Sequence, residues 1–431
     1  MTTVEQTAAF FRLRNTVQRY DWGSTSAIQD LLGLEADGRP AAELWMGAHP
    51  LAPSVAVPVD GMVDRDVAGE GAPDGEGATS RTLLDLVRTG PAAALGPRVL
   101  DTYGPRLPFL LKVLAAERAL SLQVHPHPHR ARAGFNRENR EGVPRDSPLR
   151  SFHDDQHKPE MVVAVSRFEG LSGFRRPRRI LELLDGLDGD LVARMRAALA
   201  ARPTEAGVRE AFTLALHART APDVAADLAR TVASVRGRDE AGAVAGARSR
   251  RADATVLALA EQHPGDPGAV VSLMLNRVTL EPGEAMFVPS GHVHAYLSGC
   301  AVEVMASSDN VLRAGLTSKL VDVDALLECA TCVPGPAARP SVAVDAASGL
   351  TTYRPPVAEF ALQAGPVRPG TAVDLPDAGP RVVLSLAGEL VLAAGAGGET
   401  RLRQGESVFV PHAAGPLSVR GDGHVVVAYV P

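Results

Sequence analysis

Histidine is the residue whose placement in this sequence points most directly to chemistry. Of the 12 histidines in 431 residues, three lie in QVHPHPH, which starts at Gln123, and two lie in GHVHAY. Residues i and i+2 of a strand point to the same side, so Gln123 and His125 would share one face, as would His292 and His294. Two such pairs inside a barrel could surround one ion, because imidazole nitrogen with amide or carboxylate oxygen suits Zn²⁺ and similar divalent metals. The alternative for either pair is a surface strand with two hydrated rings.

Two glutamates stand next to apolar runs. Glu160 ends the segment His-Lys-Pro-Glu and enters the run Met161–Val165. A carboxylate in such a place is costly unless it is paired or bound to metal, and the alternative is a hydrated residue of an edge strand. Glu303 lies within CAVEVMA, a run expected to be buried, so a functional role is indicated there as well.

Lysine is rare among the basic residues of this chain. The formal net charge is −6, and only three of the 44 basic residues are lysines, namely Lys112, Lys158 and Lys319. A net negative chain has no general attraction to nucleic acid or to an anionic membrane. A phosphate-bearing ligand would therefore need a local cation cluster, and Arg313 with Lys319 would supply one.

The surrounding pattern predicts mainly β structure interrupted by helices. Short apolar runs separated by Gly and Pro, as in residues 270–306 and 350–431, predict an antiparallel sandwich or barrel. Residues 178–262 have apolar residues at i, i+3 and i+4, which predicts helices, with a polar connector near their centre at 237–254. The Gly-rich, acidic segment 60–80 is typical of a long exposed loop.

A short internal repeat suggests that one β motif occurs twice. GEAMFVP, ending at Pro289, and GESVFVP, ending at Pro411, share five of seven residues. The first copy is followed by His292 and His294, whereas the second is followed by His412 alone. We therefore expect the first copy to carry function and the second to serve as a scaffold.

Longer blocks of the sequence resemble a known family. YDWGS, AELWMGAHP, LPFLLKVLAAERALSLQVHPH, HKPEM, VHAYLSG and EVMASSDNVLRAGLTSKLVDV are similar to the signature blocks of type I mannose-6-phosphate isomerases, in the same order, over residues 20–323. The resemblance implies a mainly β chain with an inserted α-helical domain and two cupin (jelly-roll) β-barrels. It divides the chain into a catalytic barrel (1–174 and 266–334), a helical insertion (175–265) and a C-terminal barrel without metal (335–431).

The resemblance also implies site residues and a reaction. One Zn²⁺ per chain would be held by Gln123, His125, Glu160 and His294. Catalytic roles fall to Arg313, Glu303 and Lys158, and contacts to the substrate fall to Ser121, Lys319, Trp22 and Glu43. The reaction would interconvert D-mannose 6-phosphate and D-fructose 6-phosphate through an enediol, with Arg313 stabilising the enediolate and Glu303 a candidate base. Residues alone do not separate Glu303 from a histidine or a metal-bound water as that base.

Two rival functions use a similar pocket. A cupin-type metal dioxygenase would place Fe(II) in a His/Glu shell and would need neither the amide of Gln123 nor the cations Arg313 and Lys319. A non-catalytic sugar-binding cupin would have lost a ligand or the catalytic cation, and neither loss is seen in the sequence.

The expected partner is a small-molecule sugar phosphate, with no nucleic acid and no membrane, and we expect a monomer. No apolar run approaches the ~18–20 residues that span a bilayer. Three cysteines are too few for a disulfide framework, which favours the cytoplasm. Cys329 and Cys332 form a C-x-x-C without the second pair that a zinc ribbon needs, so we assign them no metal or redox role.

Overall fold

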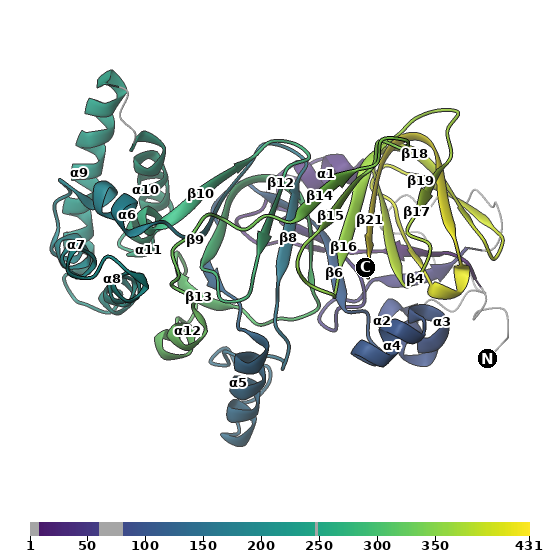
Figure 1. Cartoon of the computed structure of the whole chain (residues 1–431), viewed down its shortest axis with the longest axis horizontal. Coiled ribbons are helices and arrows are strands. Elements are labelled where there is room, and N and C mark those ends of the chain that lie inside the picture. Colours follow the sequence, from purple (N-terminus) through teal and green to yellow (C-terminus); the bar gives the residue numbers. More distant parts are fainter. Residues whose placement is uncertain (1–7, 60–80, 246–248) are drawn as a thin grey trace. The chain divides into compact units, whose positions relative to one another are not determined.

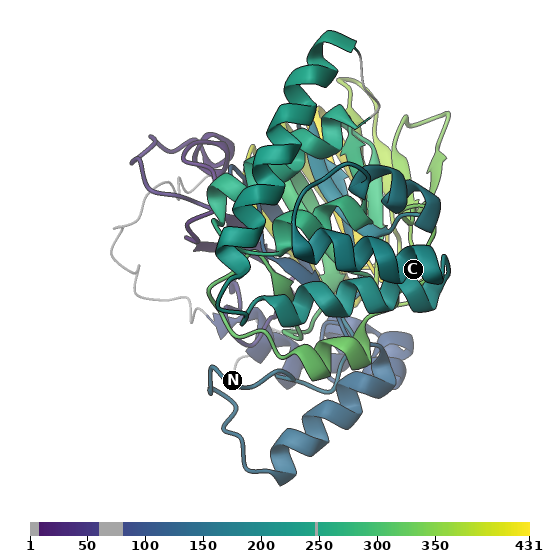
Figure 2. The same ribbon diagram turned by 90° about the vertical axis from the view of Figure 1, so that its left-hand side faces the viewer.

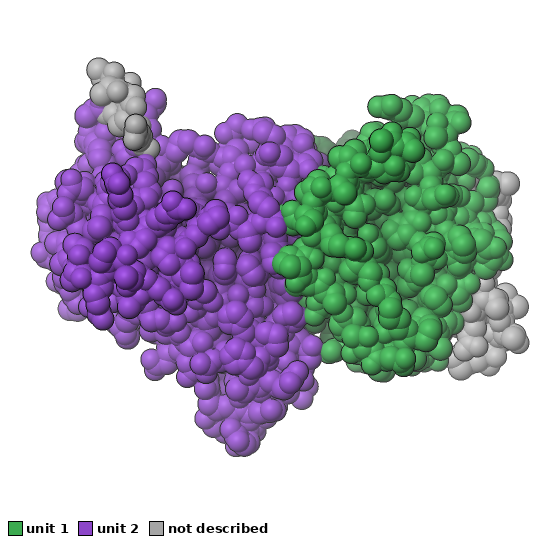
Figure 3. Space-filling view, in the orientation of Figure 1, with its two compact units in different colours: residues 1–115, 301–307, 340–431 green, residues 116–300, 308–339 purple. Residues whose placement is uncertain are grey.

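The computed structural model describes residues 8–59, 81–245 and 249–431, and it is mainly β-sheet with α-helices between the strands. The chain divides into two compact units, coloured separately in Figure 3. Unit 1 comprises residues 1–115, 301–307 and 340–431, and unit 2 comprises residues 116–300 and 308–339. The predicted acidic loop at 60–80 lies outside the described residues.

Unit 1 contains an antiparallel sheet with the strand path β14-β15-β16-β21-β18-β20-β1-β4-β5 (Figure 1). Strand β17 pairs with β21, and β19 pairs with β18. The strands are β1 (Phe11–Arg14), β4 (Val55–Pro58), β5 (Arg81–Thr82), β14 (Ser341–Val344), β15 (Thr351–Arg354), β16 (Ala361–Val367), β17 (Val373–Leu375), β18 (Arg381–Ala394), β19 (Glu399–Arg403), β20 (Ser407–Val410) and β21 (Leu417–Tyr429). Alternating apolar side chains of β18 and β21, such as Val383 and Val425, form a core inside this sheet.

Three further strands of unit 1 form a second antiparallel set, in which β3 lies between β2 and β6. They are β2 (Thr16–Gln18), β3 (Glu43–Met46) and β6 (Phe109–Ala116). All eight residues of β6 are buried, which explains its almost unbroken apolar sequence FLLKVLAA. The helices of unit 1 are α1 (Ala27–Leu32), α2 (Leu83–Thr89), α3 (Pro91–Leu95) and α4 (Pro97–Tyr103).

The strands of unit 2 carry or adjoin the predicted metal ligands. They are β7 (Leu122–Val124), β8 (Glu160–Ala164), β9 (Phe168–Phe174), β10 (Leu275–Leu280), β11 (Ala285–Val288), β13 (Leu312–Gly315) and the first part of β12 (His294–Ala306). Strand β12 pairs with β9 and with β7, and β7 pairs on its other side with β13. Strand β8 pairs with β11 and β12.

Helices occupy the predicted helical segment of unit 2 and face the viewer in Figure 2. They are α6 (Pro177–Leu184), α7 (Asp190–Ala201), α8 (Glu205–Ala218), α9 (Val224–Ala245) and α10 (Arg250–Gln262), followed by α11 (Gly268–Val271) and the 3₁₀ turn η1 (Ser272–Met274). Helices α5 (Pro128–Arg140) and α12 (Val323–Cys329) complete the unit. The predicted polar connector at 237–254 is wrong over 237–245 and 250–254, which lie in α9 and α10, whereas residues 246–248 lie outside the described residues. Arg238 of α9 contacts Asp253 of α10 at 2.5 Å.

The two copies of the repeat form equivalent local structures. Gly283 and Gly405 both have positive φ, of 86° and 79°, and each turn leads into a four-residue buried strand, β11 or β20. After β20, His412 lies in the short 3₁₀ turn η2 (His412–Ala414), where its Nδ1 accepts a hydrogen bond from the Gly379 amide. Within the described ranges, none of the helices is both long and apolar enough to span a membrane.

Candidate active site

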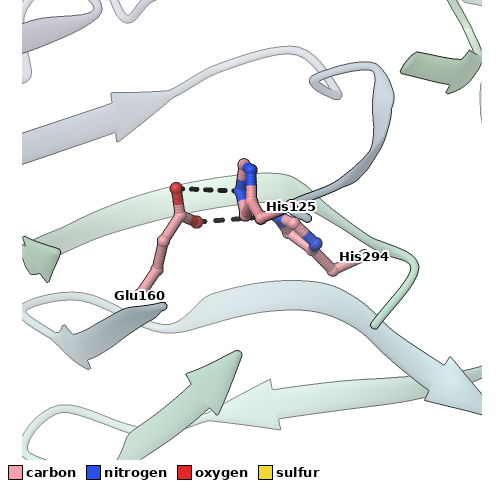
Figure 4. Close-up of side chains that lie close together, drawn as sticks. All are labelled: His125, Glu160 and His294. Carbon is pink, nitrogen blue, oxygen red and sulfur yellow. Dashed lines mark ion pairs between the residues drawn. The ribbon is translucent and has the colours of Figure 1, made fainter. Parts of the chain in front are cut away.

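Three buried side chains of unit 2 converge at strand ends. His125 follows β7, Glu160 is the first residue of β8, and His294 is the first residue of β12. Their exposed fractions are 1%, 3% and 2%. One ligand atom from each lies within 4.8 Å of the others, and Figure 4 shows both imidazole rings beside the carboxylate. Two imidazoles and one carboxylate match the donor set of zinc sites with three protein ligands.

Backbone carbonyl groups set the tautomers of both histidines. The Nδ1–H of His125 donates to the Asn310 carbonyl at 2.7 Å, and the Nδ1–H of His294 donates to the His292 carbonyl at 3.0 Å. Because a carbonyl only accepts, each Nε2 is left with its lone pair. These Nε2 atoms lie 3.1 Å and 3.5 Å from the Glu160 carboxylate, and the Nε2 of His125 has no hydrogen bond. Two lone pairs and an anion therefore face one another, an arrangement that a cation stabilises.

Burial and neighbouring charge reinforce this state. Burial lowers the pKa of His125 to about 4, even though Glu160 opposes the shift, so the ring is neutral near pH 7. Burial disfavours the Glu160 carboxylate, but the Lys158 ammonium favours it, and the pKa of Glu160 lies well below its usual range. The Lys158 ammonium is 3.2 Å from Glu160 Oε1, and the Tyr296 hydroxyl donates to Oε2 at 3.1 Å. The carboxylate thus remains an anion although it is buried.

Strand register places Gln123 beside these residues. Gln123 of β7 is paired with His294 of β12 on one side and with Arg313 of β13 on the other. Direct cross-strand partners point to the same face of a sheet, so the three side chains form one row. The Gln123 amide also donates to the Ser121 hydroxyl at 3.3 Å. His292, by contrast, lies in the turn before β12.

Lys319 lies beyond this row. It follows β13 in an exposed turn, where its amide donates to Thr317 Oγ1 at 3.1 Å.

A second group of charged residues lies within unit 1. Lys112 of β6 is buried, with its ammonium 3.4 Å from Glu43 of β3 and 3.2 Å from Glu303 of β12. Glu43 also accepts a hydrogen bond from the Trp45 indole at 2.7 Å. Two predicted site residues, Glu43 and Glu303, thus contact the same lysine. The predicted burial of Glu303 is confirmed, at 1% exposure.

Trp22 is another predicted site residue of unit 1. It is half-buried in unit 1 and stacks on Tyr20, with ring centroids 5.7 Å apart.

Comparison with known proteins decides the family. A family model described as phosphomannose isomerase type I, catalytic domain, matches residues 10–177. The mannose-6-phosphate isomerase of Escherichia coli (strain K12) is 32% identical over 427 residues, which is 97% of this chain and 99% of that protein. The chain belongs to the type I phosphomannose isomerase family. The resemblance seen in the sequence is therefore confirmed.

Solved phosphomannose isomerase structures agree along nearly the whole chain. The Salmonella typhimurium mannose 6-phosphate isomerase bound to its substrate f6p and zinc matches with a TM-score of 0.83 and 31% identity, covering 98% of this chain and 100% of that one. A zinc-bound holo mannose 6-phosphate isomerase gives the same TM-score and coverage. The Salmonella typhimurium (strain LT2) enzyme is 33% identical over 428 residues.

Three residues that contact these groups were not assigned a role from the sequence. Lys112 stands out in the sequence as one of three lysines, yet the pattern gave it no partner. Tyr296 lies two residues after His294, and this i+2 spacing was a usable signal for a shared face. Asn310 had no local signal, because it contacts His125 across 185 positions of the chain.

Proposed function

We propose that this chain is a zinc-dependent aldose–ketose isomerase that interconverts D-mannose 6-phosphate and D-fructose 6-phosphate through an enediol. The observation that carries the proposal is the convergence of the two Nε2 lone pairs on the Glu160 carboxylate. The relatives named above are isomerases of this sugar phosphate pair by name or by their bound ligand, and they favour neither the dioxygenase nor the sugar-binding alternative.

The proposed zinc ligands are Gln123, His125, Glu160 and His294, with one ion per chain. His125, Glu160 and His294 are supported by their burial and mutual distances, and Gln123 is supported by its register beside His294. Lys158 and Tyr296 contact Glu160 and hold its two oxygens in place. When bound, the ion would supply Lewis-acid polarisation of a sugar oxygen.

The remaining chemistry falls to side chains of this chain. Isomerisation moves a proton between C1 and C2, so it needs a base, a charge partner for the enediolate oxygen and a donor for the second oxygen. Arg313 is proposed as the charge partner, because register places it on the same face as Gln123. Lys158 is proposed as the donor. Glu303 remains the candidate base, supported by its burial and by the Lys112 ammonium 3.2 Å away.

Substrate contacts are proposed for Ser121, Lys319, Trp22 and Glu43. Lys319 is an exposed cation shortly after β13, and a point charge of this kind suits a phosphate group. Ser121 accepts a hydrogen bond from the Gln123 amide and would contact the sugar from the position just before β7. Trp22 and Glu43 are proposed to border the pocket.

The finer architecture is also a proposal. We infer two cupin barrels, the catalytic one formed by 1–174 and 266–334 and the metal-free one by 335–431, with 175–265 as a helical insertion. The paired turns before β11 and β20 support a duplicated motif, and α6 to α10 occupy the proposed insertion. The proposed partner is a sugar phosphate only, bound by a cytoplasmic monomer. The net charge of −6 supports the absence of a nucleic-acid partner.

A coupled assay that follows fructose 6-phosphate tests the function. The purified protein should isomerise mannose 6-phosphate, lose activity in a chelator, and regain it when Zn²⁺ is restored. The dioxygenase alternative instead predicts oxygen uptake with Fe²⁺, which an oxygen electrode measures. Full isomerase activity in protein shown by elemental analysis to be metal-free would overturn the proposal.

A further inference from the structure

We propose that Asn310 is a positioning residue that holds His125 and the segment leading to Lys158 and Glu160 in a single arrangement. The inference rests on the proposed function, because it assumes that these residues form the zinc site. Asn310 is fully buried in the segment between β12 and β13, and it lies three residues before Arg313.

The backbone of Asn310 contacts one side of the site. Its carbonyl oxygen accepts the Nδ1–H of His125 at 2.7 Å, which fixes both the tautomer and the orientation of that ring. The ring can turn its Nε2 toward Glu160 only while this carbonyl keeps its position.

The side chain of Asn310 holds the opposite side. Its Oδ1 accepts the amide hydrogens of His153 and Asp154, at 2.8 Å and 3.3 Å. Its Nδ2 donates to the carbonyl groups of Asp154 and Gln156, both at 2.8 Å, and to Asp154 Oδ1 at 3.1 Å. One amide therefore satisfies both donors and acceptors of a single loop, which neither a carboxylate nor an aliphatic side chain can do.

Asp154, in the same loop, contacts the residues that precede Asn310. Its carboxylate accepts the Ser308 hydroxyl at 2.9 Å and the Asp309 amide at 2.8 Å. The chain around Asn310 and the loop 153–156 thus bind each other in both directions. The loop continues directly into Lys158 and Glu160, so displacement of Asn310 would move His125 and Glu160 apart.

Asn310→Asp tests this role, because it removes both Nδ2–H donors and sets a carboxylate against Asp154. We expect zinc affinity, measured by competition with a chromophoric chelator in the absence of sugar, to fall about 10–100-fold, the usual effect of an outer support of a metal ligand. Asn310→Ala adds no buried charge and should also weaken zinc binding. It provides the test if the aspartate variant fails to fold.

Asp253→Asn is the matched control. Asp253 is also fully buried in unit 2, where it pairs with Arg238 between helices α9 and α10. Exchange of one carboxylate oxygen for nitrogen weakens this pair. It should lower the unfolding temperature and leave zinc affinity unchanged. Folded Asn310 variants with wild-type zinc affinity would overturn the proposal, as would an equal loss in Asp253→Asn. Wild-type protein that binds zinc without isomerising the sugar would refute the proposed function alone.

Discussion

The carboxylate of Asp266 holds Leu316 in a left-handed backbone conformation. Asp266 Oδ2 accepts the Leu316 amide hydrogen at 2.9 Å, and Leu316 has φ of 55°, the one positive value among described residues other than glycine. Such a conformation costs a side-chain-bearing residue roughly 1–2 kcal/mol. Asp266 also pairs with Arg219, the residue that follows α8, at 2.5 Å. The turn after β13, which leads to Lys319, is therefore fixed by a residue from the end of the helical segment.

Asp266→Asn should raise the KM for mannose 6-phosphate more than it lowers kcat. The variant loses a charged partner of Arg219 and weakens the hold on Leu316, at a cost of about 1–3 kcal/mol in stability. Lys319 then takes more conformations, so the phosphate is held less well. Steady-state kinetics beside thermal melts measure both effects.

The control for this variant is Asp227→Asn. Asp227 also accepts backbone amide hydrogens, those of Asp190 and Leu191, and pairs with an arginine, Arg230. Asp227→Asn should lower the free energy of unfolding by a similar amount and leave the KM unchanged. An equal rise of KM in both variants would mean that Asp266 acts through global stability only.

Arg313→Lys should reduce kcat by about 100-fold or more, the scale of losing one oriented donor to developing charge. Lysine keeps the charge but not the planar fork of the guanidinium. Zinc content should be unchanged, which elemental analysis checks. A near-normal kcat would remove Arg313 from the chemistry.

His294→Ala should purify largely without metal and without activity, whereas His292→Ala should keep zinc and most activity. His294 presents its Nε2 to Glu160, while His292 lies in the preceding turn and supplies a carbonyl that survives the substitution. Zinc content and isomerase rate of both variants decide the matter. The opposite pattern would shift the assigned ligand by two residues.

One equivalent of tightly bound zinc is expected per chain. The C-terminal copy of the repeat is followed by His412, whose Nδ1 already accepts a hydrogen bond from Gly379. Elemental analysis of the dialysed protein gives the ratio. A second tightly bound equivalent would contradict the assignment of residues 350–431 as a scaffold.

The C-x-x-C thiols should be inert in the native protein at pH 8. Burial raises the pKa of Cys329 to about 12 and that of Cys332 to about 11. Above the ordinary thiol pKa, the unfolded chain releases protons that the folded chain keeps. The free energy of unfolding therefore falls as pH rises from about 9, by up to about 1.4 kcal/mol per pH unit for each thiol.

Alkylation and denaturation measure this effect. Iodoacetamide at pH 8 should label these two cysteines only after unfolding. The loss of stability between pH 8 and pH 10 should be smaller in a Cys329→Ser/Cys332→Ser variant, which isolates the thiols from other groups that titrate in this range. Rapid labelling of the native protein would contradict the assigned burial.

Sequence pattern predicted candidate ligands because the signals were local, but alternation left His292 and His294 equivalent, and it was the resemblance that gave the set of four. Gln123, His125, Glu160 and His294 each lie in or beside an apolar strand, and alternation by two gives their faces. The structure brings three of them together and sets the fourth in register.

What the pattern missed depends on contacts between distant segments. Lys112 meets Glu43 and Glu303 across strands, and no spacing rule predicts which strands become neighbours. The connector at 237–254 failed for a related reason. Its polar residues suggested flexibility, but Arg238 of α9 pairs with Asp253 of α10 and links the two helices.

The acceptors that set both histidine tautomers are main-chain carbonyl groups, at His292 and Asn310. Every amino acid carries such a carbonyl, so replacing either side chain removes no acceptor. A substitution at either position during evolution can shift the imidazole ring, but it does not by itself move the ring proton from Nδ1 to Nε2. Sequence change at His292 and Asn310 therefore alters the position of the two Nε2 donors and keeps their lone pairs.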